Sequence, residues 1–344
     1  MAGASIDPTR APVAFGRRAV PQLFGELLQP ETGTRLRALA SLCDLIHDPE
    51  RIQQTAHGGF LEQLKVLFKD EDSSVRTKTC ELLHLLTSHS IGRQALLASS
   101  LLPPLSQLLD DSSSSCRRRV HGVLNHLALL PAGAEALLTL VPKLMLKLKE
   151  HEEAHEEEEE VLLLSTIRSC SRLDALPALA SDGVSLLGRK LSHRSPNIRR
   201  EAAGALMALS VCEDGRRQVC EEALLPVLVD LLQDANVEVQ ANAAGVIMYT
   251  GINTAGKQRC LDLNVVPVLL GLVSREEEEE ERRRRKALVM YSLRALLVLA
   301  EAPAGRSLLL KQLPLLVRRS GAAEEDQDIR RAAQTAVRVV TWTP

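Results

Sequence analysis

Aromatic side chains are scarce in this sequence. Phe, Trp and Tyr together make up 2% of the 344 residues, whereas hydrophobic residues as a whole make up 45%. The core must therefore be built from Leu, Val, Ala and Ile, which suits close helix packing better than a β-sandwich rich in aromatic rings. The composition predicts an all-α protein with a large buried core.

The sequence lacks the residues that several classes of function need. The formal net charge is −2 and the pI is about 6.5, so no global field attracts nucleic acid or an anionic membrane. The sequence has no signal-peptide core and no apolar run of the roughly 18 residues that a membrane span needs, which favours a cytoplasmic protein. It also has no GxSxG, P-loop or GxGxxG motif, so we expect no cofactor, no small-molecule substrate and no enzymatic activity.

Cysteine usage argues against a disulfide framework or a zinc ribbon. The seven cysteines are scattered, odd in number and never spaced CxxC. This usage predicts buried thiols in a reducing compartment. The positions are Cys43, Cys80, Cys116, Cys170, Cys212, Cys220 and Cys260.

A repeat of about 41 residues runs along nearly the whole chain. Segments such as LLPPLSQLL, LLPVLVDLL and VVPVLLGLV share one anchor position, which is usually proline. Proline fits the first turn of a helix, and the period is typical of armadillo or HEAT units. We therefore expect an all-α, right-handed armadillo/HEAT-type solenoid superhelix. The anchors are Pro21, Glu62, Pro103, Pro142, Val184, Pro226, Pro267 and Pro314.

The repeat sets the expected domain organisation. Residues 1–15 are expected to be a flexible N-terminal segment, and residues 16–344 a single armadillo-like solenoid of about eight repeats. After each anchor comes an amphipathic stripe with small or apolar residues on one helical face, as in residues 198–209 and 239–250. This stripe predicts a third, core-forming helix in every unit, and Trp342 is expected to cap the last one.

A glycine follows each stripe, usually beside Arg or Lys. We expect these glycines to supply the backbone freedom that a short turn between helices needs. The neighbouring basic residues are interpreted as structural rather than ligand-binding. The glycines are Gly92, Gly133, Gly215, Gly256 and Gly305.

Two charge runs, at residues 150–160 and 275–286, interrupt the pattern between second and third helices. Their glutamates are expected to be freely solvated, and four of them in the second run precede an arginine by four residues, the spacing of exposed helical ion pairs. The first run contains HEEAH at residues 151–155, the spacing of a zinc-peptidase helix. Glu158 and Val161 stand where the longer motif needs Gly and His, so we expect no metal site and no catalysis.

The third helices supply two candidates for partner binding. Armadillo proteins that hold peptides carry an Asn ladder on this helix, but the corresponding positions here are Leu85, His126, Ala208, Tyr249 and Val298. The missing ladder disfavours an import-type peptide groove. His126 and Tyr249 remain candidate partner-binding residues.

Three further candidates lie in the segment SLCDLIHDPE at residues 41–50. They are Asp44, His47 and Asp48. A structural interpretation stands beside the functional one, because Asp48 and Pro49 are also suited to ending a helix.

Segments that depart from generic repeat consensus carry a resemblance to a known family. SLCDLIHDPE, TSHSIGRQALL and NAAGVIMYTGINTAGK resemble, in the same order, an armadillo-repeat family of radial spoke proteins of motile cilia. The resemblance implies a structural, non-enzymatic component of the axonemal radial spoke that supports spoke assembly and ciliary motility through other radial spoke proteins. It implies a place in the cytoskeleton of the cilium or flagellum. The alternative is a cytosolic or nuclear armadillo adaptor that binds peptide segments of signalling or cargo proteins.

Overall fold

The computed structural model describes residues 18–150, 157–275, 278–321 and 326–342. Within these ranges the chain is helical and contains no strand, which confirms the all-α repeat fold. The chain divides into two compact units, residues 1–140 and 141–344. The N-terminal segment predicted to be flexible lies outside the described residues. A single continuous solenoid and its right-handed superhelix stay predictions.

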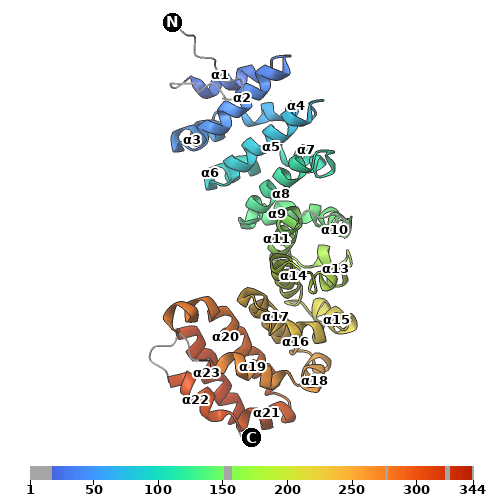
Figure 1. Ribbon diagram of the computed structural model, residues 1–344, viewed down its shortest axis with the longest axis vertical. Coiled ribbons are helices and arrows are strands. Elements are labelled where there is room, and N and C mark those ends of the chain that lie inside the picture. The colour runs from blue at the N-terminus through green and yellow to red at the C-terminus, as the bar shows by residue number, and fades with distance from the viewer. Residues whose placement is uncertain (1–17, 151–156, 276–277, 322–325, 343–344) are drawn as a thin grey trace. The chain divides into compact units, whose positions relative to one another are not determined.

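The first unit stacks three pairs of second and third helices (Figure 1). The pairs are α1 (Ala19–Glu26) with α2 (Thr32–Leu45), α4 (Leu64–Leu67) with α5 (Ser73–Thr87), and α7 (Leu102–Gln107) with α8 (Ser114–Ala128). Three further helices occupy the first-helix positions, namely α3 (Pro49–His57), α6 (Ser90–Ala98) and α9 (Pro131–Leu137). Single 3-10 turns precede α4 at η1 (Leu61–Gln63), follow α7 at η2 (Leu108–Asp110) and follow α9 at η3 (Leu138–Leu140).

The second unit contains five such pairs. They are α10 (Val141–Glu150) with α11 (Glu157–Leu173), α13 (Gly183–Lys190) with α14 (Pro196–Leu209), α16 (Leu225–Leu231) with α17 (Val237–Thr250), α19 (Val265–Ser274) with α20 (Glu279–Leu299), and α22 (Leu313–Gly321) with α23 (Gln327–Val340). The first helices between them are α12 (Leu176–Leu179), α15 (Glu213–Glu221), α18 (Thr254–Asp262) and α21 (Pro303–Leu310).

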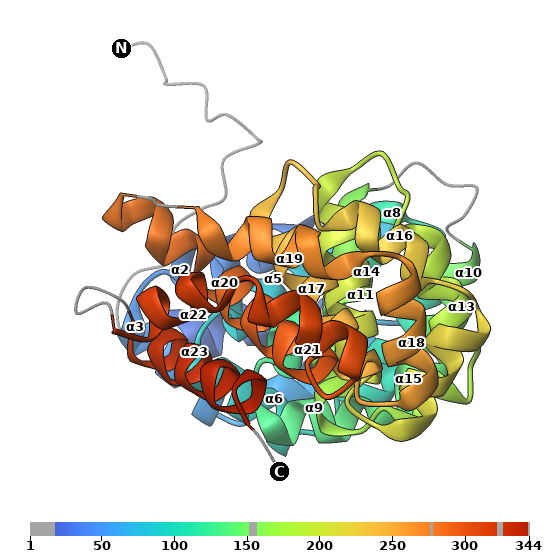
Figure 2. The same cartoon turned by 90° about the horizontal axis from the view of Figure 1, so that it is seen from below.

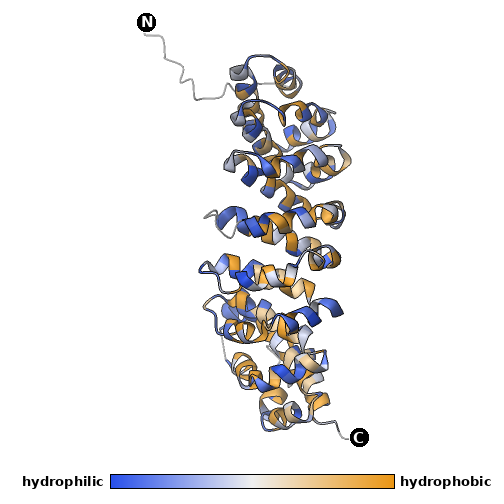
Figure 3. Cartoon of the chain, turned by 90° about the vertical axis from the view of Figure 1, so that its right-hand side faces the viewer, coloured by the Kyte–Doolittle hydropathy of each residue, from blue (hydrophilic) through white to orange (hydrophobic). Residues whose placement is uncertain are grey.

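The third helices form the core of each unit. In the first unit α5 packs between α2 and α8, and in the second α11, α14, α17, α20 and α23 pack on one another in order. Figure 2 shows α21, α22 and α23 gathered beside α20. The apolar stripe of α14, from Ile198 to Leu209, is buried as predicted. Apolar residues accordingly lie where the helices pack (Figure 3), and their burial stabilises the stack by about 25 cal/mol per Å².

The glycines after the third helices have a different role from the one predicted. Gly92 and Gly215 lie inside first helices, and Gly59 is the glycine with a positive φ among the described residues. A Cβ on Gly215 would overlap the carbonyl oxygen of Leu209, and the same overlap recurs at Gly92, Gly133, Gly256 and Gly305. The expectation of a flexible turn is therefore wrong. Glycine is needed because the next helix crosses close against the end of the preceding one.

Trp342, expected to be a hydrophobic cap on the open end of the stack, lies largely in solvent. Its side chain is 59% exposed. The guanidinium carbon of Arg306 lies 5.9 Å from the centroid of its ring, a cation–π contact. The last described core helix is instead α23, whose outer face carries exposed polar side chains such as Arg331, Gln334 and Arg338.

Candidate protein-binding surface

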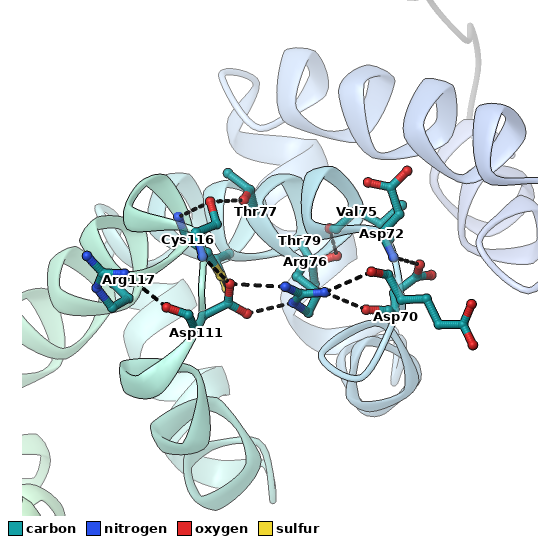
Figure 4. A network of polar contacts seen from close by, with 12 residues as sticks. Asp70, Asp72, Val75, Arg76, Thr77, Thr79, Asp111, Cys116 and Arg117 are labelled. Carbon is teal, nitrogen blue, oxygen red and sulfur yellow. Dashed lines mark hydrogen bonds and ion pairs between the residues drawn. The ribbon is translucent and has the colours of Figure 1, made fainter.

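An Arg–Asp ion pair joins consecutive repeats and recurs in register. Arg76 lies in the first turn of the third helix α5, and its Nε atom is 2.6 Å from Oδ2 of Asp111, at the end of the next second helix (Figure 4). The equivalent pairs, each 35 residues apart, are Arg35–Asp70 at 2.9 Å and Arg199–Asp234 at 2.7 Å.

Each arginine of these pairs also caps a helix in its own repeat. Nη1 of Arg76 donates to the carbonyl oxygen of Asp70 at 2.8 Å (Figure 4), and Nη1 of Arg199 donates in the same way to the carbonyl oxygen of His193 at 2.8 Å. Carbonyl groups at the end of a helix lack partners within it, so one side chain satisfies them and links two repeats. The 41-residue register of these Arg and Asp residues could have predicted the contact, but the sequence analysis missed it.

The environment of Asp111 keeps its carboxylate ionised. Burial favours a higher pKa for Asp111, but hydrogen bonds from Arg76 and from the backbone N–H of Ser113, at 2.8 Å, outweigh it and hold the pKa below its ordinary value. The pair is therefore a charged joint between repeats.

The basic residues that follow the glycines also have structural contacts. Nη1 of Arg93 donates to the carbonyl oxygens of Thr87 and Ser88, both at 3.0 Å. Nη1 of Arg216 donates to Val211 at 2.7 Å. These contacts satisfy carbonyl groups at the ends of third helices, in keeping with the structural interpretation.

Part of the first acidic run is buried, so the expectation that it is freely solvated is wrong for these residues. Glu159 and Glu160 are 1% and 3% exposed, and Oε1 of Glu160 lies 2.7 Å from Nζ of Lys190. Ser195 donates a hydrogen bond to Glu157, which lowers the pKa of that carboxyl. The reason is that residues 157–160 form the first turn of α11. The HEEAH segment at residues 151–155 lies outside the described residues.

The second charge run is partly exposed and partly buried. Arg283 pairs with Glu279 at 2.5 Å and Arg284 with Glu280 at 2.9 Å, each four residues apart, as predicted. Arg285 is instead 2% exposed, and its Nη2 donates to the carbonyl oxygen of Leu272 at 3.3 Å. It therefore packs against the end of α19 rather than projecting into solvent.

The candidates near the end of α2 are accessible to solvent. Asp44 and His47 are exposed. Asp48 is exposed too, and its Oδ1 accepts a hydrogen bond from the N–H of Glu50 at 2.9 Å, which makes Asp48 the N-cap of α3. The structural interpretation of Asp48 therefore has a direct contact behind it, and partner binding by the three residues stays a prediction.

His126 is half-buried within the first unit. Its ring stacks on that of His84, with centroids 4.6 Å apart, and its Nδ1 lies 3.1 Å from Oγ1 of Thr87. Burial lowers the pKa of His126, and the charge of Arg93 lowers it further. These contacts give His126 a packing role between α5 and α8, and its role in partner binding stays untested.

Tyr249 belongs to the second unit, whereas the other four candidates belong to the first. It lies on α17 and is half-buried. Neighbouring third helices contribute residues to the same region that the sequence did not point to. Met207 of α14 and Tyr291 of α20 both lie against Gly245, one helical turn before Tyr249. We call the following residues of α11, α14, α17 and α20 the second-unit third-helix face: Arg168, Arg172, Arg200, Glu201, Met207, Glu238, Tyr249, Tyr291 and Arg294.

The residues that the structure describes provide neither a metal-binding cluster nor a membrane-spanning helix. No group of three or more His, Cys, Asp or Glu side chains among them is placed to hold a metal ion. None of the described helices combines the length and the apolar character needed to cross a bilayer.

Stacked three-helix repeats, tied together by charged joints and exposing polar third-helix faces, define an α-helical repeat protein. The chain belongs to the family of dynein axonemal assembly factor 5-like proteins with TPR repeats, whose sequence model matches residues 67–340. The repeats here have three helices and a period near 41, as armadillo-type units do, rather than the two helices and about 34 residues of a TPR.

Two individual proteins are similar to the chain. Radial spoke protein 14 of Chlamydomonas reinhardtii is 25% identical over 238 residues, which are 65% of this chain and 62% of that protein. This confirms the resemblance to radial spoke proteins, although the chain spans less than two thirds of the relative's length. The crystal structure of an engineered protein matches with a TM-score of 0.59 at 17% identity, covering 95% of this chain and all of that one, which supports the repeat fold alone.

Proposed function

We propose that this chain is a non-enzymatic scaffold protein of the axonemal radial spoke, where it supports spoke assembly and ciliary motility by binding other spoke proteins. The observation that carries this proposal is the similarity to Radial spoke protein 14 over 238 residues. The proposed location is accordingly the axoneme of the cilium or flagellum.

The geometry of the repeats supports a scaffold role. The Arg–Asp joints are largely shielded from water and each one connects two repeats, so they hold neighbouring helices in register. A stack of this kind offers an extended surface to partners.

A second candidate function comes from the family match. The matching family is named after an axonemal dynein assembly factor, which favours a cytoplasmic protein that helps assemble axonemal complexes without staying in them. The peptide-binding adaptor, in the cytosol or the nucleus, is a third candidate. The three differ in where the protein is found.

The test is to tag the protein in ciliated cells and extract isolated axonemes with increasing salt, with the tag alone as control. A permanent spoke component should remain on the axoneme at high salt, because obligate interfaces are large and apolar at their centre and salt screens mainly exposed charges. Recovery in the cytosol would favour the assembly factor, and recovery in the nucleus the adaptor. Either result would overturn the spoke proposal.

The non-enzymatic part of the proposal has its own test. His151→Ala combined with His155→Ala should leave folding and axonemal location unchanged, because HEEAH lacks the longer motif's ligands. Elemental analysis of the purified protein measures its metal content. Stoichiometric zinc that is lost in the double variant together with a hydrolytic activity would contradict the proposal.

A further inference from the structure

The second-unit third-helix face contains both tyrosines of the chain. Tyr249 lies on α17 and Tyr291 on α20, each half-buried. Arg294 follows Tyr291 by three residues and is exposed, so the two share one side of α20. Tyrosine and arginine are the residues most enriched among those that dominate protein–protein binding energy.

Two glycines let the third helices of this face pack closely. A Cβ on Gly204 of α14 would lie 2.7 Å from Cζ of Arg168, and one on Gly245 of α17 would overlap the sulfur of Met207. A side chain from one third helix therefore lies across a glycine of the next. Cδ2 of Tyr291 is 3.8 Å from the same position on Gly245, so α20 reaches this part of the face as well.

The face extends over four third helices, because each packs on the next in the order α11, α14, α17 and α20. Arg168 of α11 lies across Gly204 of α14, and Tyr291 of α20 lies against Gly245 of α17. Arg168 and Arg172 are four residues apart on α11 and share one side of it. The arginines of α11 thus stand at one end of the face, and Tyr291 and Arg294 of α20 stand at the other.

Positive charge on this face is only partly neutralised. Glu201 is shared between Arg168, at 3.3 Å, and Arg200, at 3.0 Å, and Glu238 accepts a further contact from Arg200 at 3.3 Å. Arg172 and Arg294 are exposed. The face therefore carries four arginines against two carboxylates, whereas the whole chain has a net charge of −2.

We infer that the second-unit third-helix face binds an extended acidic segment of a partner protein, whose carboxylates pair with Arg172 and Arg294 and whose chain lies against Tyr249 and Tyr291. Packed helices are about 8–10 Å apart, and an extended chain rises about 3.3 Å per residue, so roughly every third residue meets a new helix. Glu201 and Glu238 make the face less suited to a nucleic-acid backbone, whose charge is uniform. The inference deepens the proposed scaffold function and rests on it.

The test measures binding of a fluorescein-labelled peptide of about nine residues, with Glu alternating with Ser, to the purified full chain by fluorescence anisotropy. Arg172→Glu with Arg294→Glu should weaken binding at least about tenfold, and the same two residues changed to Gln should weaken it less. The matched control is Arg283→Glu with Arg284→Glu, which reverses two exposed arginines of the same unit and should change affinity less than about twofold.

Three results would overturn the inference. They are an absence of peptide binding by the unaltered protein, an equal loss in the control variant, and tighter binding of a single-stranded oligonucleotide with a similar number of charges. Circular dichroism of each variant checks that it is folded. If the peptide does not bind but the protein is found on the axoneme, this inference fails and the proposed function stands. Binding of the peptide by a protein found only in the cytosol would overturn the proposed function and leave this inference standing.

Discussion

The Nε atom of Arg76 lies 2.6 Å from the Oδ2 atom of Asp111, across the boundary between two repeats. The two side chains are 14% and 3% exposed, so water screens their attraction less than that of a surface pair. The same pair stands one repeat earlier as Arg35 and Asp70. The arrangement makes one ion pair the recurring joint of the stack.

Replacing Arg76 with Ala should lower the free energy of unfolding by about 2–3 kcal/mol, because it leaves a buried carboxylate on Asp111 and uncaps the end of a helix. Urea denaturation followed by circular dichroism measures the change. Arg283→Ala is the control, since that side chain is 79% exposed and exposed pairs contribute about 0–1 kcal/mol. Equal losses in the two variants would show that the joint adds nothing beyond a surface pair.

The contribution of Asp111 should depend on pH. Its pKa is lowered in the folded protein, because hydrogen bonds from Arg76 and Ser113 outweigh the effect of burial. A group of this kind stabilises the fold above its unfolded pKa, about 3.9, and that stability is lost as pH falls through the folded pKa. Asp111→Asn should therefore cost most near neutral pH, and its difference from wild type should shrink in acid. The free energy of unfolding of both proteins, measured from neutral to acid pH, tests this. A difference between them that stays constant over this range would refute the prediction.

The buried pair of Glu160 and Lys190 should show strong coupling. Lys190→Met leaves the carboxylate of Glu160 buried without its cation and should cost about 3–5 kcal/mol, whereas Glu160→Leu with Lys190→Met should regain most of that loss. Their Oε1 and Nζ atoms are 2.7 Å apart, and the side chains of Lys190 and Glu160 are 8% and 4% exposed. Chemical denaturation of Glu160→Leu, Lys190→Met and the double variant gives the coupling energy between the two side chains. A double variant as unstable as Lys190→Met would contradict the prediction.

Gly215 and Gly271 should respond in opposite ways to alanine. Gly215→Ala forces a methyl group into the carbonyl oxygen of Leu209 and should cost about 1–3 kcal/mol. Gly271 lies in α19, and no atom lies within 4 Å of the place that an added methyl group would take, so Gly271→Ala should be neutral or stabilise by up to about 1 kcal/mol. Thermal unfolding compares the two. Stabilisation by Gly215→Ala would contradict the close crossing of α15 over the end of α14.

The sequence predicts the helices well because the signals are local. The stripe from Ile198 to Leu209 repeats the period of a helix, and each of its predicted residues is buried. The pairing of Arg76 with Asp111 could also be predicted from the sequence, since both residues recur with the 41-residue period. A search for charged residues in register would have found it.

Other features depend on contacts that a local pattern does not contain. The burial of Glu160 requires Lys190, thirty residues later, and the role of Gly215 requires knowing how closely α15 crosses the end of α14. The third-helix face was missed for the same reason. Its residues come from four helices, α11, α14, α17 and α20, which meet only through packing between repeats.

The most direct measurement for the spoke proposal is electron cryotomography of cilia from cells that lack this chain, with re-expression of the wild-type protein as control. A structural spoke component predicts cilia that assemble, dynein arms that remain in place, and radial spokes that are missing or incomplete until the protein is restored. Complete radial spokes beside missing dynein arms would contradict the spoke proposal and assign the chain to dynein assembly instead.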